Sequence, residues 1–498
     1  VLTNNTFRNN VDGIYADDGA MPEITNNTFE GNTRPISVYA ARIDSTIYGN
    51  TYVDNIKDYI EVQGDEFGNG TYVWARDGGP YVLNGIVYVR LNYDNAGHTS
   101  LLRISDGTEV RSDGHSFNVG HNDDGDRYGS LQATNVTFTS LDEDGTWPGI
   151  VFHNYSRDGT HSLASYLDGC IIENATDGVY FQSSSPTIMN SIIRNNIDGI
   201  FANVESSPVI TGNTFTGNQY PLKVYARTID GNISGNTYED NMLTDSTNQD
   251  FIFVYGYDND WTRDYLRDNK TYDWLPDGAP YRITDEVWIQ ANNNGSYFPV
   301  LQIYPGTHVV LDHNRYFRIS GDNGNYRGAL KADSVRFSSY DPAFPSQGIR
   351  FYDHTVDSES YLDGCIIENA TDGVYASSSQ PVLTNNTFRN NVDGIYADDG
   401  AMPEITNNTF EGNTRPISVY AARIDSTIYG NTYVDNIKDY IEVQGDEFGN
   451  GTYVWARDGG PYVLNGIVYV RLNYDNAGHT SLLRISDGTE VRSDGHAL

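Results

Sequence analysis

The residues best suited to bind a metal ion are Asn122, Asp124 and Asp126, which alternate along a short acidic stretch. Side-chain oxygens at every second position are typical of loops that bind Ca²⁺. However, Arg127 stands where such a loop needs glycine, and no acidic residue occupies the twelfth position. The matching stretch at 321–325 keeps the turn residues and loses charge. We interpret the stretch as a turn, with a Ca²⁺ site as the alternative.

Carboxylates could also act as general acids or bases if two of them had well-separated pKa values. Two pairs of neighbouring aspartates, Asp17-Asp18 and Asp398-Asp399, have no basic residue close to them in the sequence. His115 follows Ser-Asp-Gly, which is a turn signature. We therefore predict no catalytic residues, and no cofactor other than the alternative Ca²⁺.

Asparagine could carry a third chemistry, the attachment of glycans at Asn-X-Ser/Thr sequences. Many of these sequences coincide with an Asn-rich repeat in which asparagine has a backbone role. The candidates for N-glycosylation are those in predicted loops: Asn69, Asn154, Asn269, Asn294 and Asn450.

The composition excludes some classes of partner. The chain of 498 residues has a formal net charge of −36 and a pI near 4.4. This acidity argues against nucleic acids and anionic membranes, and it favours cation binding or simple solubility. The 38 tyrosines could bind sugars or line a lateral interface. The sequence contains no stretch typical of a signal peptide or a membrane span.

The elements that would position these residues repeat with a period of 22 and then 23 residues. Leu2, Ile24 and Ile47 align, and the same period continues in later parts of the chain. The apolar columns are irregularly spaced, β-branched or aromatic, and separated by Asn, Gly, Asp and Pro, which predicts short strands rather than helices. A repeat of this length predicts a solenoid.

Two asparagine columns run through the repeat. The position before the first column holds only Asn or Gly, as in Asn4, Asn26 and Gly49, which indicates a corner with positive φ. The next asparagine can hydrogen-bond to its counterparts in neighbouring coils. The predicted structural ladder consists of Asn5, Asn27, Asn50, Asn213 and Asn236 in the first column, and Asn10, Asn32, Asn55, Asn218 and Asn241 in the second.

The N-N-x-F-x-x-N-x-x-G-I coils resemble the right-handed parallel β-helix of the pectate-lyase-like superfamily, particularly its repeat-rich surface proteins. The resemblance implies an all-β solenoid with three short strands per coil. In such a solenoid, Cys170 and Cys365 lie many coils apart, so we expect two buried, unpaired thiols.

Coils group into larger modules. A Tyr-X-Trp segment followed by Asp-Gly-X-Pro-Tyr occurs at Tyr72, Tyr272 and Tyr453, and it marks the start of three similar modules. We predict C-terminal coils of one module at 1–70, complete modules of about 190 residues at 71–270 and 271–451, and N-terminal coils of a further module at 452–498. Residues 382–496 are identical to 1–115. Such identity indicates recent duplication or continual homogenisation. We expect a tandem array longer than this chain, and the alternative is that only these two copies exist, as a fusion.

Identical tandem modules favour a structural role, because an enzyme needs one differentiated site. We predict an extracellular, cell-surface repeat protein that forms a filament, sheath or surface layer by end-to-end or lateral self-association. The alternatives are a carbohydrate-active β-helix enzyme (polysaccharide lyase, epimerase or hydrolase) and a glycan-binding adhesin. The expected partners are therefore further copies of the chain and, in the alternatives, glycans.

Overall fold

The computed structural model describes residues 1–93, 97–122, 126–142, 145–242, 247–256, 265–291, 297–321, 324–398, 400–472 and 478–498. The chain divides into two compact units. Unit 1 comprises Val1–Thr228, Asn232–Ile252 and Asp277–Ala279; unit 2 comprises Ile229–Gly231, Phe253–Pro276 and Pro280–Leu498. The module boundaries expected from the sequence remain predictions.

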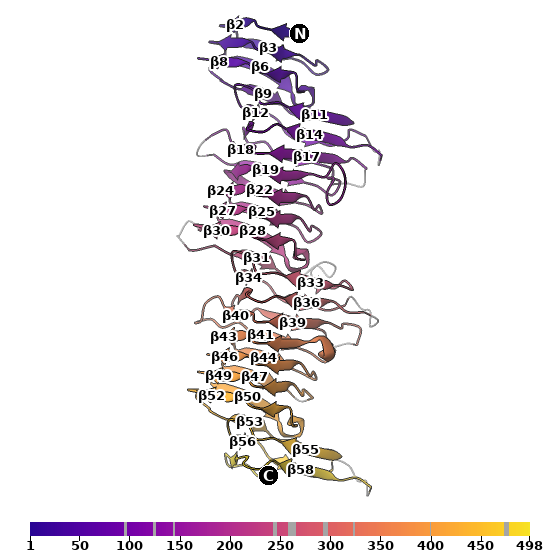
Figure 1. Cartoon of the computed structure of the whole chain (residues 1–498), viewed down its shortest axis with the longest axis vertical. Helices are drawn as coiled ribbons and strands as arrows, with labels where there is room; N and C mark the ends of the chain where they lie inside the picture. Colours follow the sequence, from indigo (N-terminus) through magenta and orange to yellow (C-terminus); the bar gives the residue numbers. More distant parts are fainter. Residues whose placement is uncertain are drawn as a thin grey trace. The chain divides into compact units, whose positions relative to one another are not determined.

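Unit 1 consists of short parallel strands, and every third strand joins the same sheet (Figure 1). A ten-stranded sheet takes every third strand from β3 (Asp12–Ala16) to β30 (Thr237–Glu239). A seven-stranded sheet does so from β11 (Gly70–Trp74) to β29 (Ile233–Ser234). A third wall runs in the same way from β10 (Asp65–Glu66) to β28 (Tyr220–Tyr225). Each coil thus contributes one strand to each wall, which is the arrangement of a parallel β-helix.

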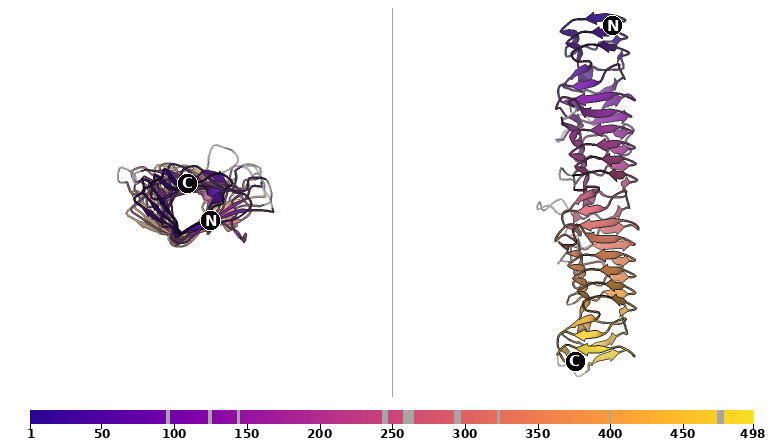
Figure 2. Two further views of the ribbon diagram at one scale, coloured as in Figure 1. Left: turned by 90° about the horizontal axis from the view of Figure 1, so that it is seen from above. Right: turned by 90° about the vertical axis from the view of Figure 1, so that its left-hand side faces the viewer.

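Unit 2 has the same construction. A ten-stranded sheet takes every third strand from β32 (Tyr265–Leu266) to β59 (Val491–Ser493). A seven-stranded sheet extends from β33 (Thr271–Trp274) to β51 (Ile428–Tyr429), and a third wall from β34 (Tyr281–Ile283) to β52 (Thr432–Val434). The right-hand view of Figure 2 shows strands of one wall stacked on one another within each unit. Short 3₁₀ helices lie between strands: η1 (Ala40–Arg42), η2 (Ala226–Thr228), η3 (Asp357–Glu359) and η4 (Ala421–Arg423).

Strand register confirms the predicted coil length of 22 to 23 residues. Leu2 pairs with Ile24, and Ile24 pairs with Ile47. The aromatic column pairs in the same way, and the rings of Phe7 and Phe29 stack with their centres 5.1 Å apart. Phe29 is fully buried, whereas Phe7 in the first coil is half-buried. Because strands alternate their side chains, the inward residues of successive coils form one continuous core.

The corners have the predicted backbone conformation. Asn4, Asn26 and Gly49 have φ angles of 57°, 55° and 71°. Asparagine and glycine adopt this left-handed conformation at low cost, and the bend lets the next strand begin in a new direction. Both cysteines, Cys170 and Cys365, are buried and unpaired, as expected.

Candidate functional site

A cluster of charged side chains near the start of the chain is built on three stacked strands, β3, β6 (Arg34–Tyr39) and β9 (Ile60–Gln63). Ile36 pairs with Ile60 on the inner face of the sheet, and both are fully buried. The strand alternation then places Ser37 and its register partner Glu61 on the outer face. Even there Glu61 is only 1% exposed, because other side chains cover it.

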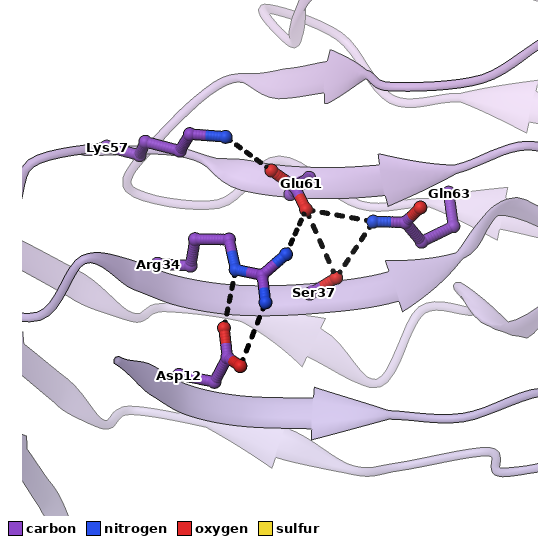
Figure 3. Close-up of polar contacts among 6 residues, drawn as sticks. All are labelled: Asp12, Arg34, Ser37, Lys57, Glu61 and Gln63. Atoms are coloured by element: carbon purple, nitrogen blue, oxygen red, sulfur yellow. Dashed lines mark hydrogen bonds and ion pairs between the residues drawn. The ribbon is translucent and has the colours of Figure 1, made fainter. Parts of the chain in front are cut away.

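Glu61 is held by cations from two sides (Figure 3). One Arg34 nitrogen donates to Glu61 at 3.0 Å, while the remaining guanidinium nitrogens bind Asp12 at 2.5 and 2.9 Å. Lys57 Nζ lies 2.7 Å from the other Glu61 oxygen. Gln63 Nε2 also donates to Glu61, at 2.8 Å. We call Asp12, Arg34, Ser37, Lys57, Glu61 and Gln63 the charged tie.

Electrostatics within the charged tie keep the carboxylate ionised. Burial alone would raise the pKa of Glu61, but the hydrogen bonds and charges of Lys57 and Arg34 outweigh it and hold the pKa below its ordinary value. Asp12 likewise raises the pKa of Arg34. Two carboxylates face two cations, so the tie is neutral and its groups are mutually satisfied. Such an arrangement joins coils together but leaves no free acid or base for proton transfer.

The identical sequence later in the chain forms the same tie. Arg415 donates to Glu442 at 3.0 Å, and Lys438 Nζ lies 2.5 Å from the same carboxylate. Gln444 also donates to Glu442, at 3.0 Å. Glu442 is 2% exposed. The charged tie is therefore present in both units.

The predicted asparagine ladder residues are brought together between coils. The backbone N–H of Asn5 donates to the Asn27 side-chain oxygen at 2.9 Å, and Asn27 N–H donates to Asn50 at 2.9 Å. The amide of Asn27 reaches back to the Leu2 carbonyl at 2.8 Å. The same coil-to-coil bonds join the other members: Asn10 to Asn32, Asn32 to Asn55, Asn213 to Asn236, and Asn218 to Asn241. Asn5 and Asn10 in the first coil are exposed, and the other members are buried.

Aspartates continue these columns where the regular coils stop, and sequence reasoning did not assign them this role. Asp77 accepts the backbone N–H of Asn50 at 2.7 Å, and Asp277 accepts that of Asn236 at 2.8 Å. In the second column, Asp58 accepts the N–H of Asn55 at 3.0 Å. The signal available was the recurring Asp-Gly-X-Pro-Tyr punctuation, whose first residue is always aspartate.

A second feature missed from the sequence is an acid pair on neighbouring coils. Asp177 and Asp198 are register partners in strands β22 (Ala175–Phe181) and β25 (Asp198–Ala202). Burial, together with the charge of Asp198, raises the pKa of Asp177 to about 6. Lys223 Nζ lies 2.6 Å from Asp198. The repeat alignment of the two Asp-Gly dipeptides was the available signal.

The predicted calcium ligands are only partly described. Asp124 lies outside the described residues. Asn122 is exposed, and Asp126 accepts a 3.3 Å hydrogen bond from the Tyr128 hydroxyl. Across the described part of the chain, no group of three or more His, Cys, Asp or Glu side chains is placed to hold a metal ion. The Ca²⁺ site therefore stays an alternative.

The candidate glycosylation sites Asn69, Asn154, Asn269 and Asn450 are all exposed, and Asn294 lies outside the described residues. Their exposure satisfies the steric requirement for attachment of a glycan, and attachment itself stays a prediction.

Comparison with known proteins identifies two families. A family described as "Right handed beta helix region" matches residues 122–262 and 305–465. A family described as "Periplasmic copper-binding protein (NosD)" matches residues 1–93. A search of curated proteins found no match. Among solved structures, a mutant of the periplasmic alginate epimerase AlgG covers 86% of this chain and 79% of its own, at 11% identity and a TM-score of 0.12. A similarity at this level supports no argument about this chain.

The copper named by the second family does not fit the residues that match it. Residues 1–93 contain no histidine and no cysteine, and their one methionine is Met21. Protein copper sites depend on imidazole, thiolate and thioether ligands.

In the described part of the chain, no helix has the length and apolar character needed to cross a bilayer.

Proposed function

The chain belongs to the right handed beta helix family, and from this premise we propose that it is a structural protein that acts outside the cytoplasm. It serves as a stiff shaft in a filament, sheath or surface layer. Further copies of the same chain are its principal partners, in end-to-end or lateral contact. The match of residues 1–93 to a family named as periplasmic supports a location beyond the inner membrane.

The observation that carries this proposal is the charged tie, present in both units. Glu61 and Glu442 are buried carboxylates of the kind that enzymes use, yet each is bound by an arginine, a lysine and a glutamine. These carboxylates form ion pairs and hydrogen bonds that join one coil to the next. The Asn columns do the same, since each side chain is bonded to the coil before or after it.

A structural role also accounts for the identity of residues 1–115 and 382–496. Each coil makes contact chiefly with its neighbours, so stability grows roughly in proportion to the number of coils. Each coil adds about 4.8 Å to the length, which is the spacing of paired strands. Duplicated coils therefore extend a shaft without any need for a new core.

Electron microscopy of the purified chain and of native material tests the proposal. We expect filaments or sheets whose repeat is commensurate with the stacked coils. Particles of single chains that release sugars from a polysaccharide would overturn it and would favour the alternative, a carbohydrate-active enzyme.

A further inference from the structure

We propose that unit 2 carries a binding site for a neutral glycan, in an open hollow beside Tyr340 and Phe344. The hollow has a volume of about 380 Å³. It lies where the loop after β40 (Arg336–Ser339) meets the loop after β37 (His308–Leu311). Its volume falls within the range of roughly 300–1,000 Å³ that is usual for small-ligand sites.

Two aromatic rings that border this hollow are exposed to solvent. Tyr340 is 38% exposed and Phe344 is 57% exposed. Each ring is supported from one side: the Arg282 guanidinium carbon lies 3.5 Å from the Tyr340 ring centre, and the His313 ring meets Phe344 edge-on at 5.7 Å. The C–H face of a sugar ring packs well on an exposed aromatic face, since both are apolar surfaces bordered by polar groups.

The polar lining suits hydroxyl groups rather than a charged ligand. Arg282 binds Asp312 through two nitrogens at 2.9 and 3.3 Å. Arg315 and Asp341 also line the hollow. The two arginines balance the two aspartates, and the wall presents both donors and acceptors, as vicinal hydroxyls require. The net charge of −36 for the whole chain further disfavours a polyanionic glycan.

The hollow is held open by backbone hydrogen bonds. Tyr340 N–H donates to the Leu311 carbonyl at 2.8 Å, and Gln347 N–H donates to the Arg315 carbonyl at 2.9 Å. Within the loop, Ala343 N–H donates to Asp341 Oδ1 at 2.9 Å. These bonds fix both ends of the loop. A ligand would meet a formed surface and would not have to order it, which lowers the cost of binding.

The matching coils within residues 71–270 lack this lining. By strand register and loop length, Arg282, Tyr340 and Phe344 correspond to Val82, Leu141 and Gly145. The coils therefore do not need an arginine, a tyrosine and a phenylalanine at these positions. Three large side chains gathered around one hollow, at positions where the matching coils do without them, indicate a role in binding.

The sister residue Leu141 supplies the substitution Tyr340→Leu, which the fold already accepts elsewhere, and Phe344→Ala removes the second ring. We would compare the whole chain with its Tyr340→Leu and Phe344→Ala variants by calorimetric titration. The probes are cellohexaose, mannohexaose, galactohexaose and a uronate hexasaccharide. The control is Tyr469→Leu, which removes an equally exposed tyrosine that also packs against an arginine, Arg471, outside the hollow.

We expect at least one neutral hexasaccharide to bind more tightly than the uronate. Tyr340→Leu and Phe344→Ala should each weaken this binding at least about tenfold, while Tyr469→Leu leaves it unchanged. Three outcomes would overturn the proposal: no binding of any neutral probe, tighter binding of the uronate, or an equal loss in the Tyr469→Leu control. Melting curves establish that each variant is folded. Assembly seen by microscopy is a separate readout, so the structural proposal can fail or hold independently.

Discussion

The hydroxyl of Tyr52 donates a 2.6 Å hydrogen bond to Asp77, a residue 25 positions later in the chain. The same carboxylate accepts the backbone N–H of Asn50, so it completes an asparagine column and an aromatic column together. Burial, then the charge of Asp77, raises the pKa of Tyr52 well above its ordinary value, which keeps the hydroxyl protonated and able to donate. A carboxylate suits this position because it offers acceptors and, unlike an asparagine side chain, has no N–H group that would need an acceptor in the next coil.

Asp77→Ala should leave the Tyr52 hydroxyl and the Asn50 N–H without acceptors. A buried donor without a partner costs about 1–3 kcal/mol, so we expect a clear fall in the denaturation midpoint. Asp77→Asn keeps one acceptor oxygen and should cost less. The control is Asp18→Ala, which removes an exposed aspartate that pairs with Arg42 at the surface and should shift the midpoint much less. Equal shifts for Asp77→Ala and Asp18→Ala would contradict the assigned role.

Glu61→Gln should destabilise the chain more than removal of a surface ion pair. It leaves Lys57 without a counter-charge beside a buried side chain, and it leaves Arg34 with Asp12 as its one carboxylate partner in the tie. We expect a cost of about 1–3 kcal/mol. Glu30→Gln is the matched control, because Glu30 pairs with Arg8 in the open, with side chains 40% and 58% exposed. Such a pair contributes about 0–1 kcal/mol. Urea denaturation measures the free energy of unfolding of both variants. A larger loss in Glu30→Gln than in Glu61→Gln would refute the stabilising role of the charged tie.

The corner and the ladder should respond differently to substitution. Asn27→Ala removes the side-chain hydrogen bonds to Leu2 and Asn5 in the preceding coil and to Asn50 in the following coil, at a cost of about 1–3 kcal/mol. Asn26→Gly should be nearly neutral, because Asn26 has a positive φ and glycine already serves at Gly49. Thermal melting of the two variants tests this contrast. Equal falls in melting temperature would show that the corner and ladder positions are wrongly assigned.

The acid pair should make stability fall as pH rises from about 4 to 6. The pKa of Asp177 is about 6 in the folded chain, above the ordinary value of 3.8, so the folded state binds more protons in this window. The stabilisation is complete below the ordinary pKa and is lost as pH rises through 6. Asp198 and Lys223 are the charged groups that face Asp177. Melting temperature against pH should show a smaller slope in Asp177→Asn than in the unmodified chain; an unchanged slope would remove Asp177 as the cause.

Both cysteines should resist alkylation in the folded chain. Burial raises the pKa of Cys170 to about 11 and that of Cys365 to about 12, so little reactive thiolate exists at neutral pH. Iodoacetamide followed by mass spectrometry should label neither cysteine until a denaturant is added. Rapid labelling of the native protein would show that one of these coils opens readily.

Much of this architecture follows from the sequence alone, because a coil is surrounded by copies of itself. The column Leu2, Ile24 and Ile47 predicted the strand register, and the Asn or Gly choice at Asn26 and Gly49 predicted the corner conformation. When two contacting residues occupy the same position in successive coils, the repeat period alone predicts their contact. The asparagine bonds between Asn27 and Asn50 are of this kind.

Only the tertiary structure decided the contacts that break the period. Asn50 meets Asp77 at a separation of 27 residues, where the repeat predicts 23, because an irregular loop intervenes. Glu61 draws Arg34 from the preceding coil and Lys57 from its own, an arrangement that depends on how side chains cover the outer face. The hollow beside Tyr340 and Phe344 forms where two loops of unlike sequence meet. Loops carry no period, so the distance between their side chains is set by the folding of the coils beneath them.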